Sequence, residues 1–194
     1  MEANKSSETK LDAILKSCDR IAHIVKSLKR FSHSDDTPSK SQVNLTNVVK
    51  EAIVLTTPSM KRNLVEHTCH CIQDSTIWAN HIEIEQVVIN LINNAIDAIK
   101  DKKDRWIEVR LQENIDMYVL AITDSGRGIP EKIKGKMFEP FFTSKSKEGG
   151  TGLGLSIIKS ILDDHNSSIA LDEANSNTSF TLRFSKCKKE NHNV

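Results

Sequence analysis

The sequence predicts an α/β fold in which a layer of helices covers one face of a mixed, mostly antiparallel sheet. Short alternating or continuous apolar runs that are typical of strands occur beside stretches with helical periodicity. These segments do not follow the regular βαβ alternation of a parallel sheet. With 194 residues and 38% hydrophobic content, the chain is long enough for one such domain and an extension.

Composition argues against several other classes of protein. The formal net charge of +1 gives no reason to propose a nucleic-acid or membrane surface, and no run of eighteen apolar residues could span a bilayer. No secretory signal follows Met1. The four cysteines are spaced too irregularly for a disulfide framework, which fits a reducing compartment. We therefore expect a cytoplasmic segment that contacts neither nucleic acid nor membrane, within a parent protein that is either soluble or membrane-anchored.

Residues 1–36 are predicted to contain one long amphipathic helix, followed by a linker at 37–42. Apolar residues recur there at a spacing of 3-4-3-4-3, which is typical of a coiled-coil or bundle helix. They are Leu11, Ile14, Cys18, Ile21, Val25 and Leu28. A single amphipathic helix cannot bury this row alone, so we expect a partner helix, either from a second copy of the chain in a homodimer or from sequence absent here.

The second folding unit is expected to cover residues 43–186, with 187–194 as a C-terminal tail. Its strands are predicted at 43–45, 64–72, 76–79, 106–111, 117–122, 169–172 and 179–184. Its helices are predicted at 46–56, 83–100 and 155–164. Thr46 is a plausible N-cap for the first of these helices, and Pro58 is expected to end it.

Three metal-ligating residue types, His67, Cys69 and Cys71, would share one face of a predicted strand. A metal site is one interpretation of this pattern. We favour the other, a plain strand that carries half-buried thiols, because no second Cys or His pair lies at zinc-finger spacing.

The stretch at 83–100 reads as one helix with two chemically different faces. Its apolar face comprises Ile84, Val88, Leu91, Ile92, Ala95, Ala98 and Ile99. A narrow polar stripe comprises Gln86, Asn90, Asn93, Asn94 and Asp97. A solvated stripe would favour Lys, Glu and Arg, because three Asn and one Asp cost roughly 2 kcal/mol of helix propensity. We therefore expect the stripe to bind something polar.

Two glycine-containing stretches contain groups that would complete a site with that stripe. In D-S-G-R-G-I-P at 124–130, after a predicted strand, the glycines allow a close backbone approach, and Asp124 can accept a hydrogen bond from an amino group. In G-G-T-G-L-G at 149–154, which leads into a helix, bare N–H groups and the positive helix end suit phosphate oxygens. Taken singly, each stretch is also compatible with an ordinary turn or loop.

An aromatic stretch, M-F-E-P-F-F at 137–142, lies between them. It would anchor a segment at 143–150 that carries Lys145 and is expected to be mobile. The other interpretation of the aromatic residues is a minor hydrophobic cluster under a long loop.

In their order along the chain, these four stretches resemble the N, G1, F and G2 boxes of sensor histidine kinases in two-component signalling. The resemblance covers about residues 43–186, and the heptad helix before it resembles the second helix of that family's dimerisation and phosphoacceptor hairpin. The resemblance implies a two-layer α/β sandwich of the Bergerat type, shared with type II topoisomerase, mismatch-repair and heat-shock chaperone ATPases. ATP would bind between the helical layer and a flexible lid.

The resemblance also implies residues that bind ATP or ADP and Mg²⁺. Asn94 matches the asparagine whose side-chain oxygen binds Mg²⁺, with Asn90 directed at the same ion and Asp97 nearby. Asp124 matches the aspartate that receives the adenine amino group. The remaining nucleotide-binding residues that it implies are Gly126, Gly128 and Ile129 around the base, Lys145 at the phosphates, Gly150, Thr151, Gly152, Leu153, Gly154 and Leu155 in the lid and helix start, and Thr178 near the adenine.

The sequence departs from the family pattern at two turns. His165-Asn-Ser-Ser168 stands where a histidine and two glycines are common, and Asn177-Thr178 stands where Gly-Thr is common. Asn tolerates the left-handed conformation, so the turns can survive. The placement of Thr178 near the adenine is nevertheless in doubt.

One position distinguishes phosphoryl transfer from hydrolysis. In the ATP-hydrolysing relatives, the residue one turn before the magnesium asparagine is a glutamate that activates water. Here that residue is Asn90, whose amide cannot take up a proton. The resemblance therefore implies a protein-histidine kinase, whose partners are the phosphoacceptor hairpin and a response regulator receiver domain.

No catalytic residue is assigned within this chain, because we expect the acceptor histidine to lie on a helix absent from it. His33 superficially resembles the acceptor signature, but Ser34 stands where an acidic neighbour should be. We therefore expect that His33 is not phosphorylated and that this fragment alone is inactive. The alternative function is a degenerate nucleotide-binding scaffold of the same fold that transfers no phosphate.

Overall fold

The computed structural model describes residues 39–143 and 151–187. The predicted dimerisation helix, with its apolar row and His33, lies outside these residues. So do Lys145, Gly150 and nearly all of the segment that is expected to be mobile. In the part of the chain that is described, no helix is long and apolar enough to cross a membrane.

The main sheet has five strands in the order β2-β4-β5-β7-β6. These strands are β2 (Glu66–Cys71), β4 (Trp106–Glu113), β5 (Met117–Asp124), β7 (Thr178–Ser185) and β6 (Ser168–Leu171). Strand β2 runs parallel to β4, and the other neighbours are antiparallel. The predicted mixed, mostly antiparallel sheet is therefore confirmed. A separate two-stranded sheet pairs β1 (Ser41–Asn44) with β3 (Thr76–Ala79).

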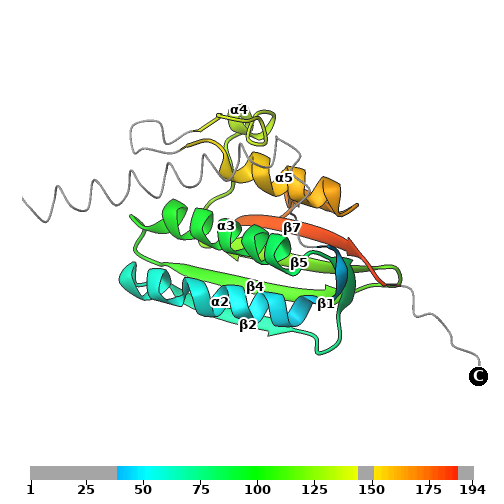
Figure 1. The fold of residues 1–194 in the computed structure, drawn as a ribbon. Helices are drawn as coiled ribbons and strands as arrows, with labels where there is room; N and C mark the ends of the chain where they lie inside the picture. The colour runs from blue at the N-terminus through cyan, green and yellow to red at the C-terminus, as the bar shows by residue number, and fades with distance from the viewer. Residues whose placement is uncertain (1–38, 144–150, 188–194) are drawn as a thin grey trace, which may run out of the picture.

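Three helices form a layer over one face of the main sheet (Figure 1). They are α2 (Leu45–Arg62), α3 (His81–Ile99) and α5 (Gly154–Asp164). Helix α3 packs against both α2 and α5 and against strands β4 and β5. The predicted arrangement of one helical layer on one sheet is confirmed. A short helix, α4 (Glu131–Lys134), was not predicted.

The central position of α3 enlarges its buried face beyond the predicted one. Most of the predicted apolar face is buried, but Val87 and Ile96 are buried as well. Ala98, which was predicted to face the core, is exposed. Because α3 has a helix on each side and the sheet beneath it, three directions bury its side chains instead of one. The periodicity of one helix cannot reveal how many neighbours it has.

Helix α2 differs from its prediction at both ends. The N-cap is Asn44, whose side-chain oxygen accepts a hydrogen bond from the Asn47 N–H at 3.2 Å. Thr46 lies inside the first turn and instead donates its hydroxyl to the Ile72 carbonyl at 2.6 Å. This bond joins the helix to the loop after β2, so the threonine serves tertiary packing rather than capping.

Pro58 does not end α2, which continues to Arg62. Proline removes one backbone hydrogen bond and crowds the preceding turn. The segment before Pro58 includes the exposed Val54 and Leu55, so water can reach this side of the helix. The last turn is held by Met60, which is only 1% exposed. Burial of this side chain offsets part of the cost of the proline.

The junction between α3 and the end of α5 depends on His165. The buried imidazole accepts a hydrogen bond at Nε2 from the Asn80 N–H at 3.0 Å, and its Nδ1–H donates to the Ile161 carbonyl at 2.7 Å. The Asn80 side chain in turn caps α3 at the Ile82 N–H. The following residue, Asn166, has a φ of 50°. The expectation that asparagine supports this turn in the left-handed conformation is confirmed.

Two thiols lie together on the exposed edge strand β2. The Sγ atoms of Cys69 and Cys71 are 3.3 Å apart. The hydrogen bond between them lowers the pKa of Cys69 to about 7 and raises that of Cys71. Within the described ranges, the three-ligand group that could hold a metal does not include these thiols or His67. The pair is therefore best described as one acidic thiol stabilised by its neighbour.

We predict that Cys69 is alkylated by iodoacetamide with a pH inflection near 7. At neutral pH about half of this thiol is thiolate, against a few per cent for a thiol of ordinary pKa, about 8.5. Replacing Cys71 with Ala removes the hydrogen-bond donor, so the inflection should move upward toward the ordinary value. Mass spectrometry of the modified peptide across pH measures both. An unchanged inflection in Cys71→Ala would contradict the stated cause.

Candidate functional site

A cavity of about 480 Å³ opens between α3, the end of β5 and the start of α5. It is lined by residues that lie between Asn90 and Phe180 in the sequence. They are Asn90, Leu91, Asn93, Asn94, Ala95, Asp97, Ala98, Ile122, Asp124, Gly128, Ile129, Pro130, Ile133, Met137, Phe142, Thr143, Thr151, Gly152, Leu153, Gly154, Leu155, Ile157, Thr178 and Phe180. Its size and its mixture of apolar and polar walls are typical of a small-molecule site.

The polar stripe of α3 forms one wall of this cavity. Asn90, Asn93, Asn94 and Asp97 all line it, whereas Gln86, which lies nearer the helix start, does not. Three amides and one carboxylate on successive turns present several oxygen atoms to the same space. Oxygen donors of this kind suit a hard divalent cation such as Mg²⁺, so the donor set fits the ion that the resemblance implies.

Asp124 lies at the end of β5 and is 4% exposed. Its Oδ1 accepts a hydrogen bond from the Gly126 N–H at 2.6 Å. The antiparallel register places Asp124 opposite Thr178, the first residue of β7, and Thr178 lines the cavity too. The sequence left the position of Thr178 in doubt, and the strand pairing brings it beside Asp124.

The turn after Asp124 is close-packed. A Cβ atom at Gly126 would lie 2.3 Å from Thr178 Oγ1 and 2.4 Å from Asp124 Oδ1, so only glycine fits there. Gly128 is different, because a Cβ there would meet nothing within 4 Å and its φ of 76° is what favours glycine. The Asn177 side chain donates to the Gly126 carbonyl at 3.0 Å. The asparagine that departs from the family pattern thus supports this turn.

The start of α5 forms another part of the cavity wall. Its N-cap, Leu153, makes no side-chain capping hydrogen bond, so the N-cap residue leaves the first-turn N–H groups uncapped. A Cβ at Gly154 would lie 3.6 Å from Asn94 Nδ2 and 3.7 Å from Asn94 Oδ1. The positive end of α5 therefore lies directly beside the amide of Asn94. The N–H groups suit an anion, and the Asn94 side-chain oxygen suits a cation bound to that anion.

The loop before α5 packs on the aromatic stretch at Gly152. That residue has a φ of 66°, and a Cβ there would lie 2.4 Å from the Phe141 carbonyl carbon. Phe141 itself is 74% exposed, whereas Met137 is buried and Phe142 lines the cavity. Phe138 packs with Met137 against the core, and Met137 and Phe142 line the same cavity. The predicted aromatic cluster is therefore present in part, and Phe141, whose backbone contacts Gly152, lies outside it.

Helix α4 brings residues to the cavity that sequence reasoning missed. Ile133 lines it, and Lys134 pairs with Glu131 at 2.8 Å and Glu173 at 3.0 Å. Hydrogen bonds to these two carboxylates raise the pKa of Lys134 above its ordinary value. The signal for this helix was present in Pro130 followed by Glu131, because an acidic residue in the first turn after proline is typical of a helix start.

Of the predicted site residues, the structure brings twelve to the cavity wall. They are Asn90, Asn94, Asp97, Asp124, Gly128, Ile129, Thr151, Gly152, Leu153, Gly154, Leu155 and Thr178. Gly126 does not line the cavity but packs against Asp124 and Thr178. Lys145 and Gly150 lie outside the described residues. Asn93, which was predicted only as part of the polar stripe, lines it too, as do Met137, Phe142 and Phe180, which were not predicted as site residues.

Comparison with known proteins identifies similar domains. A family model described as histidine kinase-, DNA gyrase B- and HSP90-like ATPase matches residues 79–188. The C4-dicarboxylate transport sensor protein DctB of Rhizobium meliloti (strain 1021) is 41% identical over 107 residues, which are 55% of this chain and 17% of that protein. The sensory histidine kinase/phosphatase NtrB of Rhizobium leguminosarum bv. phaseoli is 30% identical over 179 residues. The match covers 84% of this chain and 46% of that protein. The chain thus spans less than half of either relative.

Solved structures give the same result. The catalytic domain of histidine kinase ThkA superposes with a TM-score of 0.69 and 30% identity, covering 77% of this chain and 97% of that domain. ThkA in complex with the response regulator protein TrrA superposes with a TM-score of 0.73 and 26% identity, covering 90% of this chain and 49% of ThkA.

We predict that Gly152→Ala destabilises the domain by about 1–3 kcal/mol, because the new Cβ clashes with the Phe141 backbone and the backbone conformation is unfavourable for alanine. Gly135→Ala is the matched control. Gly135 has a φ of −65° and open space at the Cβ position. Urea unfolding should place this control within about 0.5 kcal/mol of the unmodified chain. Equal stability of the two variants would refute the close packing at Gly152.

Proposed function

Because the chain belongs to the histidine kinase-, DNA gyrase B- and HSP90-like ATPase family and has the catalytic-domain fold of a sensor histidine kinase, we propose that it binds Mg²⁺–ATP. It would donate the γ-phosphoryl group to a histidine on a dimerisation helix. The observation that carries the proposal is that the α3 stripe, Asp124 and the α5 start line one cavity. This cavity combines a carboxylate, oxygen ligands and N–H donors.

The base would bind at the Asp124 end. A buried carboxylate at a strand end can accept a hydrogen bond from the adenine amino group, and Thr178 lies opposite it in the strand register. Ile129 and Phe180 line the same cavity and offer apolar surface for a flat ring. The oxygen that already accepts the Gly126 N–H is Oδ1, so the carboxylate would serve the turn and the base together.

The phosphates would bind between α3 and the start of α5. Asn94, with Asn90 and Asp97 on the same helix face, would hold Mg²⁺ through side-chain oxygens. The bound ion would neutralise charge on the phosphate oxygens. The first-turn N–H groups of α5, beside Asn94, would donate to the same phosphates. The protein would thus act mainly by positioning the triphosphate and stabilising its charge.

Transfer is favoured over hydrolysis because Asn90 stands in the cavity where a water-activating base would be needed. Its amide cannot take up a proton from water. An imidazole nitrogen can attack the γ-phosphorus directly, so that the bond to the bridging oxygen breaks and ADP leaves. The acceptor histidine would be supplied by a hairpin outside this chain. The phosphoryl group would then pass to a response regulator, a class of partner that ThkA has in its solved complex.

The first prediction of this proposal is that ATP and ADP bind, and that Mg²⁺ strengthens the binding of ATP. Asn94→Ala should remove the effect of Mg²⁺, because it removes an oxygen ligand. Asp124→Ala should weaken both nucleotides by roughly 10- to 150-fold, the equivalent of a hydrogen bond to a charged group, about 1.5–3 kcal/mol. Titration calorimetry with and without Mg²⁺ measures both effects.

The matched controls are Asn47→Ala and Asp116→Ala, which change exposed residues that do not line the cavity. They should bind both nucleotides like the unmodified chain. Thermal unfolding verifies that each variant is folded. The site assignment fails if Asn94→Ala and Asp124→Ala behave as these controls do.

A second prediction concerns transfer. With radiolabelled ATP and Mg²⁺, label should appear on a separately supplied hairpin that carries an acceptor histidine, and not on this chain. Nucleotide binding without any transfer to cognate hairpins would support the scaffold alternative instead. Acid-labile label on this chain that disappears in His33→Gln would refute the expectation that the acceptor lies elsewhere.

A further inference from the structure

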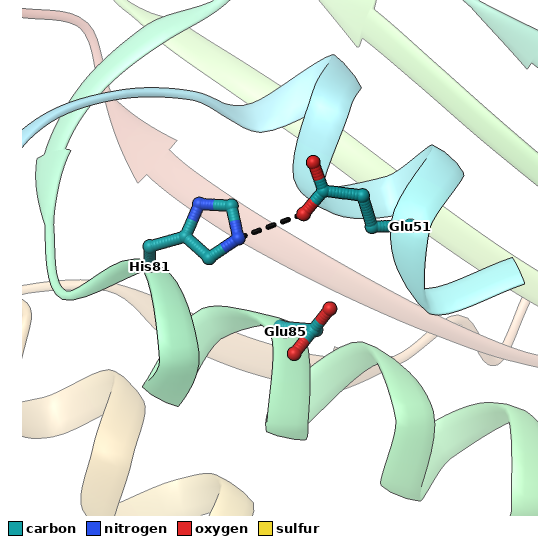
Figure 2. A group of neighbouring side chains, drawn as sticks. All are labelled: Glu51, His81 and Glu85. Atoms are coloured by element: carbon teal, nitrogen blue, oxygen red, sulfur yellow. Dashed lines mark hydrogen bonds and ion pairs between the residues drawn. The ribbon is translucent and has the colours of Figure 1, made fainter. Parts of the chain in front are cut away.

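Three metal-ligating side chains converge at the contact between α2 and α3, away from the cavity. Glu51 comes from α2, whereas His81 and Glu85 come from the first turns of α3 (Figure 2). Their ligand atoms all lie within 4.8 Å of one another, and His81 Nε2 is 2.8 Å from Glu51 Oε2. Because His81 and Glu85 are four residues apart, they lie on the same face of α3.

The geometry leaves room for one ion. Two ligand atoms that each lie about 2.1 Å from a tetrahedral ion are roughly 3.4 Å apart. The printed spacing of 2.8 Å is shorter than this value and all three ligand atoms lie within 4.8 Å of one another, so rotation of partly exposed side chains would be enough to form the site. His81 and Glu51 are 43% and 52% exposed, which gives them that freedom. The backbone positions on two packed helices need no rearrangement.

An ion pair alone does not account for the arrangement. The pair between His81 and Glu51 uses one carboxylate, and the second, from Glu85, is directed at the same place (Figure 2). In the part of the chain that is described, Glu85 has no ion-pair partner of its own. Two carboxylates would balance the charge of a divalent ion and outweigh the positive start of α3.

We propose that Glu51, His81 and Glu85 form a binding site for Zn²⁺ or a similar transition-metal ion. An imidazole nitrogen with two carboxylates suits a borderline ion such as Zn²⁺, and three protein ligands leave one position for water. Mg²⁺ prefers oxygen ligands in near-octahedral geometry, so this site is chemically distinct from the polar stripe. None of its three residues lines the cavity.

The bound ion would fasten the middle of α2 to the start of α3. His81 follows Asn80, which caps α3 and bonds to His165 at the end of α5. The site is therefore adjacent to the point where the start of α3 meets the end of α5. The three residues come together only in the folded chain. An ion that binds this site therefore raises the unfolding temperature.

The test is titration of the whole chain with ZnCl₂, without nucleotide, by calorimetry and thermal unfolding. We expect one site at the helix contact and a rise in unfolding temperature. His81→Gln and Glu85→Gln should each weaken this site at least tenfold and abolish the temperature rise. His70→Gln, at an exposed histidine on β2, is the matched control and should change neither.

The thiols require a separate control, because thiolates are Zn²⁺ ligands in general and Cys69 and Cys71 lie close together. The titration is repeated in a Cys69→Ala/Cys71→Ala variant, and Co²⁺ replaces Zn²⁺ for spectroscopy. Co²⁺ absorption without thiolate-to-metal charge transfer, lost in His81→Gln, supports the proposal. Zn²⁺ affinity that is insensitive to His81→Gln and Glu85→Gln, or no binding in the thiol-free variant, overturns it. These outcomes do not depend on nucleotide binding.

Discussion

The constraint on which this domain depends is the position of α3. The helix packs between α2 and α5 and over β4 and β5, so eight of its 19 residues are buried. Burying amides and a carboxylate without partners would be costly. The stripe from Asn90 to Asp97 must therefore face an opening, and the helical layer leaves that opening beside the start of α5. The cavity exists because the central helix carries polar groups on one side.

Close backbone contacts then determine the shape of the opening. Gly126 lets Asp124 and Thr178 lie together at the end of two paired strands, and Gly152 lets the loop before α5 lie on the Phe141 backbone. Gly154 brings the start of α5 against Asn94. At each of these positions glycine has no side chain, so backbone groups or open space lie where a side chain would be. A site built in this way presents donors and acceptors to a ligand without enlarging the core.

The balance of neutral and charged groups suits the proposed ligand. Asn90, Asn93 and Asn94 offer oxygen atoms without negative charge, so they can hold a cation without repelling phosphates. The carboxylates at Asp97 and Asp124 lie on different elements. The site at Glu51, His81 and Glu85 has the opposite composition, because two of its three ligands are charged. The polar stripe and this site share helix α3, but they favour different kinds of ion.

Local patterns in the sequence determined the elements of this protein. Alternation and apolar runs predicted the strands, and helical periodicity predicted α3 and its polar stripe, because these signals depend on neighbours a few residues apart. Asp124 and the glycines were recognised from short motifs. The same local reasoning failed for Pro58 and Thr46, because it does not include the burial of Met60 or the bond to the Ile72 carbonyl.

Only the tertiary structure decided which distant residues meet. The pairing of Asp124 with Thr178 follows from strand register, and the contact of Gly154 with Asn94 follows from packing of α5 on α3. The convergence of Glu51 on His81 requires two helices to cross at one point. These contacts join residues that are about 30 to 60 positions apart along the chain. No local pattern encodes them, because they result from burying the apolar faces of all the elements at once.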